Sequence, residues 1–179
     1  MLKKMAPLFM LLAALGFAVS AAAHLAAAFG PWETFPFYVM GLHAGIFIVF
    51  LPSVLIVNSL AKDYKQRELW NAALRGCPDW MRKALYGLFA YALVNFVYFL
   101  SVVPKGRPER VAGGVPAMVV RGFSGHWMIF YALSFATFYS YLHAEEADGL
   151  RRCANGHRVS AVARFCETCG APVGASSGH

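Results

Sequence analysis

Four long apolar segments constrain the fold of this chain more than any other feature of its sequence. They cover approximately residues 6–29, 38–60, 84–103 and 125–143. A helix needs about 20 predominantly apolar residues to cross the hydrocarbon core of a bilayer. Each segment is close to or above that length, and none contains Asp, Glu, Lys or Arg. We therefore expect an all-α membrane protein in which residues 1–144 form a four-helix transmembrane bundle.

The first segment has two interpretations. Lys3 and Lys4 precede an apolar run that reaches the small residues Ser20–Ala23, which is the arrangement of a cleaved secretory signal peptide. The apolar run continues to Phe29, however, so it is longer than a typical signal core and long enough to remain as a span. We favour the retained span, while removal of residues 1–23 stays open. Both interpretations place residue 30 on the outer side.

The basic residues of the chain are arranged as a topology signal. The net charge is +7, but Lys and Arg lie beside the apolar segments rather than on a face interleaved with aromatic residues. We therefore expect membrane lipids, and no nucleic acid, as partners. With the N-terminus inside, twelve of the 16 Lys and Arg residues lie on the inner side, and the other four lie in the loop at 104–124. This distribution predicts a bacterial inner (plasma) membrane protein with both termini in the cytoplasm.

Small and polar residues within the spans predict how the helices pack. Gly41 and Gly45 form a G-x-x-x-G motif, which lets a second helix approach closely and makes an oligomer possible. Two sets of polar residues recur with helical spacing, namely Tyr91, Asn95 and Tyr98 in the third segment and Ser134, Thr137 and Tyr141 in the fourth. We expect these two polar faces to hydrogen-bond to each other across the bundle. A short helix is expected at 64–75.

The C-terminal part of the chain carries the most specific chemistry. Cys153 and His157 enclose a short Ala-Asn-Gly turn, and Cys166 and Cys169 form a C-x-x-C pair followed by glycine. Three cysteines and one histidine at this spacing are a complete tetrahedral ligand set for a structural zinc ion. Because the protein supplies all four positions, we favour a structural zinc site over a redox dithiol, and over no metal at all. A cytoplasmic tail would keep these thiols reduced.

The same stretch resembles the short zinc-ribbon domains found at the ends of many bacterial proteins. The resemblance rests on the phrase Ala-Arg-Phe-Cys-Glu-Thr-Cys-Gly-Ala-Pro at 163–172 and covers residues 151–173. The first pair departs from the usual pattern, since it has C-x3-H instead of C-x2-C. The resemblance implies a small folded interaction module without catalysis. We expect a hinge at 145–150 before the ribbon and a flexible tail at 174–179.

Histidines are the remaining ionisable residues of the spans. His24, His43 and His126 lie near one depth on three different predicted helices, towards the outer side. Imidazoles arranged in this way could ligate haem or copper. Histidines near a membrane interface also commonly hydrogen-bond to water, headgroups or backbone, and this second interpretation is the simpler one.

These observations favour a non-enzymatic membrane protein. Motifs for nucleophilic, phosphate-binding or metalloprotease chemistry are absent from the sequence, and so are paired carboxylates within the spans. We expect an adaptor or accessory subunit of a membrane assembly, with the zinc ribbon docking a cytosolic or membrane protein. The alternative is a haem- or metal-binding redox subunit that uses His24, His43 and His126.

Overall fold

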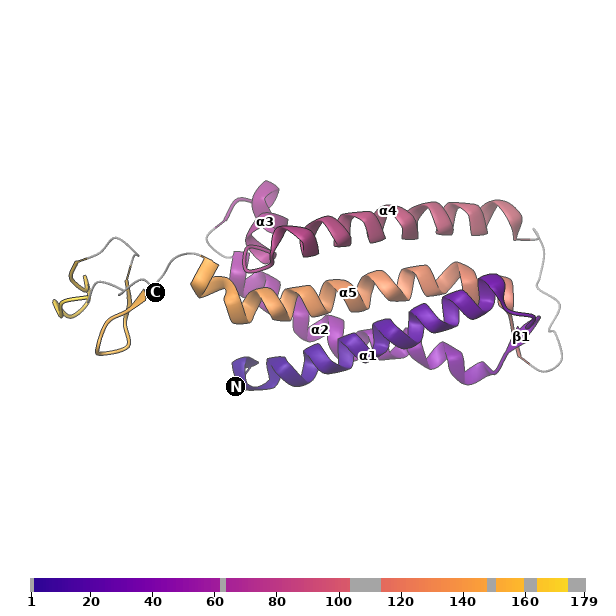
Figure 1. Cartoon of the computed structure of the whole chain (residues 1–179), viewed down its shortest axis with the longest axis horizontal. Coiled ribbons are helices and arrows are strands. Elements are labelled where there is room, and N and C mark those ends of the chain that lie inside the picture. Colours follow the sequence, from indigo (N-terminus) through magenta and orange to yellow (C-terminus); the bar gives the residue numbers. More distant parts are fainter. Residues whose placement is uncertain (1, 62–63, 104–113, 148–150, 160–163, 174–179) are drawn as a thin grey trace.

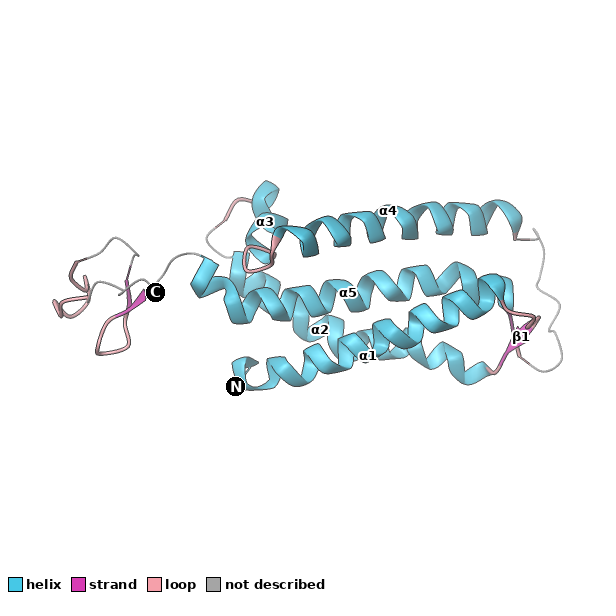
Figure 2. Ribbon diagram, in the orientation of Figure 1, coloured by secondary structure: helices cyan, strands magenta, loops and turns pink. Residues whose placement is uncertain are grey.

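Four long helices dominate the structure of the protein. A computed structural model describes residues 2–61, 64–103, 114–147, 151–159 and 164–173. The long helices are α1 (Leu2–Phe29), α2 (Gly41–Ala61), α4 (Asp79–Val102) and α5 (Ala117–Ala147). They run side by side as a bundle, and the C-terminal segment with its short strands follows α5 (Figures 1 and 2). The molecule is therefore mostly helical, as the sequence predicts.

Three of the described helical stretches are long and apolar enough to cross a membrane. They are Lys3–Phe29, Phe37–Ala61 and Asp79–Val102, and the second includes the 3-10 helix η1 (Phe37–Met40) that leads into α2. The fourth predicted span lies within α5, which is not among them. Its Ser, Thr, Tyr and His residues make α5 less apolar than the other three helices. The structure thus supports a membrane protein with three candidate spans around a more polar fourth helix.

Helix α5 lies at the centre of the bundle, where it contacts α1, α2 and α4 (Figure 1). Its Trp127 and Phe138 are fully buried. Its closest packing is with α1, which buries Ala6, Ala13 and Ser20 at seven-residue intervals. Small side chains at this spacing let two helix backbones approach each other, which is how helices associate inside a bilayer.

The two ends of the bundle are built differently. At the proximal end, which we define as the end where α1 begins and α5 finishes, Ala6, Leu60 and Ala144 belong to one buried cluster. At the opposite, distal end, strands β1 (Thr34–Phe35) and β2 (Val115–Pro116) pair antiparallel. This pairing, with the hydrogen bond from Ala117 N to Glu33 O (2.8 Å), ties the α1–α2 connection to the start of α5. The strand pair therefore positions the first turn of α5.

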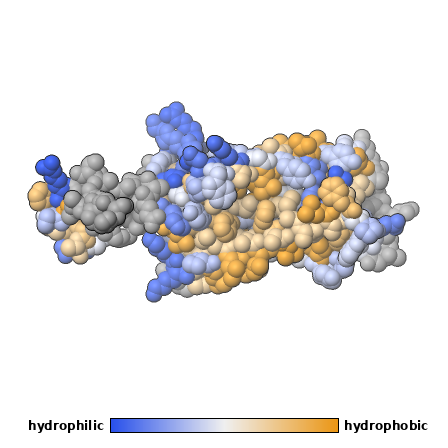
Figure 3. Space-filling model, in the orientation of Figure 1, coloured by the Kyte–Doolittle hydropathy of each residue, from blue (hydrophilic) through white to orange (hydrophobic). Residues whose placement is uncertain are grey.

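The outward faces of the bundle are apolar. In the most apolar 18-residue stretch of each candidate span, only 17–22% of the residues are buried inside the protein. Large side chains such as Ile48, Phe89 and Val94 are more than half exposed. Figure 3 shows apolar residues along the middle of the bundle and hydrophilic ones gathered at its proximal end. A water-soluble protein rarely exposes so much contiguous apolar surface, whereas lipid chains solvate it without cost.

Several predicted boundaries shift in the structure. The helix expected at 64–75 is shorter, because only η2 (Gln66–Glu68) and α3 (Leu69–Ala73) are helical before Gly76. The fourth long helix begins at Ala117, well before residue 125, because β2 anchors the chain there and the apolar residues 117–120 continue into the helix. Helix α5 also covers the first three residues of the predicted hinge at 145–150, and the remaining three lie outside the described residues.

The two glycines of the second span, Gly41 and Gly45, have different surroundings. A side chain at Gly45 would meet the Tyr131 hydroxyl of α5, which donates a hydrogen bond to Leu42 O (2.8 Å). A side chain at Gly41 would meet nothing within 4 Å. The close approach permitted by Gly45 therefore serves packing within the chain, while the expected oligomer through Gly41 and Gly45 stays a prediction.

Candidate metal centre

The first ligand pair lies on a tight hairpin after α5. Strands β3 (Arg151–Arg152) and β4 (Arg158–Val159) pair antiparallel, so the five residues between them must reverse the chain. Cys153 N donates to His157 O (3.0 Å), and Gly156 N donates to Cys153 O (2.8 Å). Gly156 adopts a φ of 79°, a conformation that glycine allows without steric cost. The Asn-Gly turn thus brings Cys153 and His157 together.

The second ligand pair lies on a knuckle closed by backbone hydrogen bonds. Cys166 N donates to Ala171 O (2.9 Å), and Gly170 N donates to Cys166 O (2.7 Å). Gly170, directly after the second cysteine, has a φ of 69°. Phe165 and Pro172 form an antiparallel bridge at the base of the loop. The C-x-x-C-G spacing therefore folds as expected, with both cysteines on one turn.

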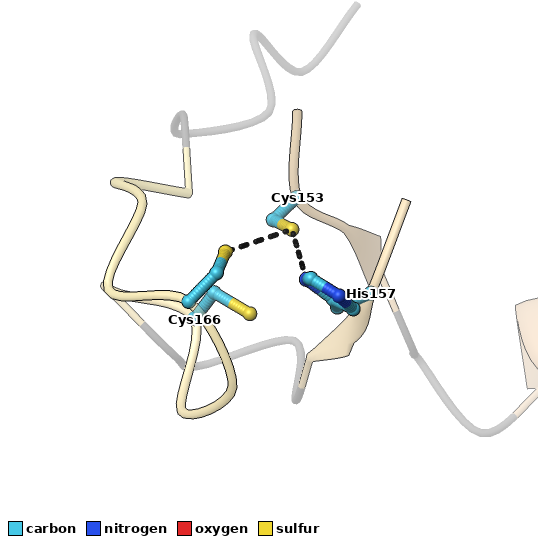
Figure 4. A group of neighbouring side chains, drawn as sticks. Cys153, His157 and Cys166 are labelled. Carbon is cyan, nitrogen blue, oxygen red and sulfur yellow. Dashed lines mark hydrogen bonds between the residues drawn. The ribbon is translucent and has the colours of Figure 1, made fainter. Parts of the chain in front are cut away.

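The four ligand residues converge on one point. The ligand atoms of Cys153, His157, Cys166 and Cys169 all lie within 4.8 Å of one another. Cys153 Sγ is 3.7 Å from Cys169 Sγ and 3.6 Å from His157 Nδ1. Figure 4 shows the side chains of Cys153, His157 and Cys166 directed towards one another. These residues form a group that could hold a metal ion.

The distances fit the dimensions of a tetrahedral zinc site. With Zn–S near 2.3 Å, Zn–N near 2.05 Å and tetrahedral angles, two sulfurs would be about 3.8 Å apart, and sulfur and nitrogen about 3.6 Å apart. The observed separations of 3.7 Å and 3.6 Å agree with both values. The donor set, three thiols and an imidazole, also matches a common class of structural zinc site.

The surroundings of the cluster favour one thiolate in particular. The backbone N–H of Ala171 and the side chains of Asn155 and His157 lower the pKa of Cys169 to about 6, so this thiol is ready to bind a cation. Asn155 Nδ2 donates to Cys169 Sγ at 3.4 Å. Burial raises the pKa of Cys153 instead. The sequence alone indicates Asn155 as a turn residue, whereas in the structure its amide also donates a hydrogen bond to the ligand residue Cys169.

His24 is held in a buried polar contact between three helices. Ser124 Oγ donates to Arg121 O (3.1 Å), so it accepts from His24 Nδ1 at 2.8 Å. His24 Nε2 then accepts from the Tyr91 hydroxyl. Because both ring nitrogens already have partners, His24 serves in this structure to join α1 to α4 and α5.

His43 and His126 have different surroundings. His43 Nδ1 accepts a hydrogen bond from the indole N–H of Trp127 (3.1 Å). The ring of His126 lies against Phe130, with centroids 4.8 Å apart, and it lines an apolar groove of about 610 Å³ between α4 and α5. Within the described part of the chain, the tail cluster is the one group of three or more side chains that could hold a metal ion together, and the three histidines do not form such a group. Their role as haem or copper ligands stays a prediction.

Comparisons with known proteins add no family to this description. No protein-family model matches the chain, and neither a curated protein nor a solved structure matches it. The function of the chain is therefore inferred from its residues and their geometry.

Proposed function

We propose that the protein is a non-enzymatic integral membrane protein that acts as an adaptor or accessory subunit of a membrane assembly. In this proposal its tail is a zinc ribbon that docks a protein partner. The observation that carries the proposal is the convergence of four protein ligands on one point at the end of a membrane bundle. A site in which the protein fills every coordination position leaves none for substrate, so the metal serves to fold the tail.

The bundle would hold four spans in this proposal, with α5 as the central one. The polar residues that lower its hydropathy are turned inwards, because Ser124, Ser134 and Thr137 are at most 1% exposed. Neighbouring helices can shield such residues from lipid. The regular burial of Ala6, Ala13 and Ser20 against α5 supports retention of α1 as a span.

The proposed orientation places the proximal end in the cytoplasm of a bacterial inner membrane. The basic residues Lys4, Lys65 and Lys83 are exposed near this end. Positive charge collects on the cytoplasmic side of membrane proteins. A reducing cytoplasm would also keep Cys153, Cys166 and Cys169 free to bind zinc.

Metal analysis and crosslinking on matched cysteine variants test this proposal. Purified full-length protein should contain one zinc per chain, and Cys166→Ser should lose it. Cys77→Ser is the matched control, because Cys77 lies outside the cluster in contact with Ala136, so its zinc content should match the wild type.

The same variants test the docking role. In native membranes, a crosslink from the tail to a discrete protein should be present in the wild type and in Cys77→Ser, and absent in Cys166→Ser. Zinc-free wild-type protein, or a crosslink that survives Cys166→Ser, would overturn the adaptor proposal.

The alternative function is a haem- or metal-binding redox subunit that uses His24, His43 and His126. Its support is the position of all three histidines on helices of the bundle, where His24 is buried, His43 is half-buried and His126 is exposed. The hydrogen bonds that occupy both nitrogens of His24 and one nitrogen of His43 weaken it. An absorption spectrum separates the two functions, since a Soret band that His43→Ala removes would favour the redox subunit.

A further inference from the structure

We propose that a cavity at the distal end of the bundle binds the phosphate group of a phospholipid. The cavity measures about 240 Å³ and lies where α1, α4 and α5 meet. Its polar wall is formed by Asn95, Tyr98 and Arg121, and its apolar wall includes Phe99, Val102 and Met118. The headgroup would lie against the polar wall and the start of its acyl chains against the apolar wall.

The depth of the cavity matches the headgroup layer of a membrane. Val102 is the last residue of α4, and Met118 is the second residue of α5. The cavity therefore lies at the level where two long helices end or begin, beside the apolar faces of the bundle. Met118, Val102 and Tyr98 are 38%, 41% and 50% exposed, so its rim is continuous with the surface that faces lipid.

Arg121 provides the charge that a phosphate requires. Its Nε is buried, and no described residue accepts a hydrogen bond from it. The lining of the cavity contains no carboxylate. Arg121 is partly buried. Desolvating part of a guanidinium without a counter-ion has a free-energy cost, and the planar fork of this group matches a phosphate well. We therefore expect an anion from outside the described residues to complete this site.

The surrounding residues hold the arginine in place. The guanidinium lies over the Tyr98 ring, with Cζ 5.2 Å from the ring centroid. Asn95 Nδ2 donates to Arg121 O (3.0 Å) and to Gly122 O (3.3 Å). Gly122 lets α4 approach here, because a side chain at this position would overlap the Phe99 ring. The site is thus built from fixed backbone and a stacked side chain, and its geometry is formed before a ligand arrives.

Lipid titration by native mass spectrometry tests the proposal on full-length, delipidated protein in detergent. The probe is dioleoylphosphatidylglycerol, whose phosphate is its single charged group. Arg121→Gln should bind it roughly ten- to a hundredfold more weakly, since hydrogen bonds to charged groups contribute in this range. Lys83→Gln, which removes an exposed positive charge at the proximal end, should bind it as the wild type does.

Two competition experiments identify the source of the phosphate. Both use the wild-type protein, so they do not depend on the folding of a variant. Dioleoylglycerol, which has the same acyl chains without phosphate, should fail to displace the lipid. Inorganic phosphate at equal concentration should also fail, because it cannot use the apolar wall. Equal displacement by dioleoylglycerol would make the site purely apolar, and equal displacement by inorganic phosphate would make it a free-anion site. Either result, or equal losses in Arg121→Gln and Lys83→Gln, would overturn the proposal.

Discussion

Cys77 and Cys169 show how far burial and hydrogen bonding separate two thiols of one chain. Cys77 is buried among Leu74, Met81 and Leu85, and its thiol donates to Ala136 O (3.2 Å). This burial raises the pKa of Cys77 to about 11. Backbone and side-chain donors lower the pKa of Cys169 to about 6. The first thiol is a packing residue, whereas the second is prepared to bind a cation.

The raised pKa of Cys77 predicts slow alkylation that accelerates with pH. Because the thiolate is the reactive form, about one Cys77 in a thousand is reactive at pH 8, and the rate should rise about tenfold per pH unit up to pH 10. Mass-spectrometric quantification of maleimide labelling in folded, detergent-solubilised protein measures this rate. Labelling of Cys77 as fast as that of Cys169 in metal-free protein would contradict the prediction.

At the residue scale, the sequence predicted ligands better than hydrogen-bond partners. Cys166 and Cys169 were predictable because a C-x-x-C-G spacing determines its own local turn. The contact of His24 with Ser124 was not predictable from the sequence, because it depends on the rotation of α1 against α5. One signal was present: His24 continues the row of small residues Ala6, Ala13 and Ser20 along one helical face. That row marks the buried face of α1 and therefore His24 as an interior residue.

At the element scale, some buried hydroxyl groups of α5 have a hydrogen-bond partner and others do not. Ser140 Oγ accepts a hydrogen bond from Gly76 N (3.0 Å), which ties α5 to the turn before α4. Ser134 Oγ and Thr137 Oγ1 are buried and have no partner among the described residues. The expected hydrogen bonds between this face and the polar residues of α4 are thus not formed by Ser134 or Thr137. Asn95 instead bonds to the backbone of α5.

These differences predict opposite effects for two substitutions on one helix. Thr137→Val removes an unsatisfied buried hydroxyl while keeping its shape, so it should raise the free energy of unfolding by about 1 kcal/mol. Ser140→Ala removes a hydrogen bond and leaves Gly76 N unpaired, so it should lower that free energy by about 1–3 kcal/mol. Thermal unfolding in detergent, followed by circular dichroism, measures both. A loss of stability in Thr137→Val would show that its hydroxyl has a partner.

The sequence predicted the long helices well and their ends less well. Apolar length alone located all four, but α4 begins at Asp79, five residues before the predicted segment at 84–103. The start of α5 was predicted too late because its first turn is fixed by pairing between Phe35 and Val115, which are far apart in the chain. Such long-range pairing leaves no local sequence signal.

At the scale of the whole molecule, the tail and the bundle have separate cores. The small core of the tail is formed by Cys153, Val159 and Cys166, with Val173 packed against it. The larger clusters of the bundle consist of residues from α1 to α5 and their connections. Each part should therefore respond on its own to a change in conditions.

Metal chelation is predicted to unfold the tail alone. In a core this small, a bound metal would supply most of the folding free energy, so a strong zinc chelator should make the chain after α5 sensitive to protease. The helical signal and the thermal midpoint of the bundle should stay unchanged. Parallel proteolysis and circular dichroism before and after chelation measure both effects. A bundle that melts earlier after chelation would show that the two parts depend on each other.

The short connection between α5 and β3 limits where the tail can go. Helix α5 ends at Ala147 and β3 begins at Arg151, so their Cα atoms can be at most about 14 Å apart. A protein bound to the tail would therefore stay within a thin shell of water beside the bilayer. Confinement of this kind raises the effective concentration of one membrane-bound partner for another. If the tail docks a protein as proposed, partners that already reside at the membrane are expected to bind in preference to those that diffuse freely.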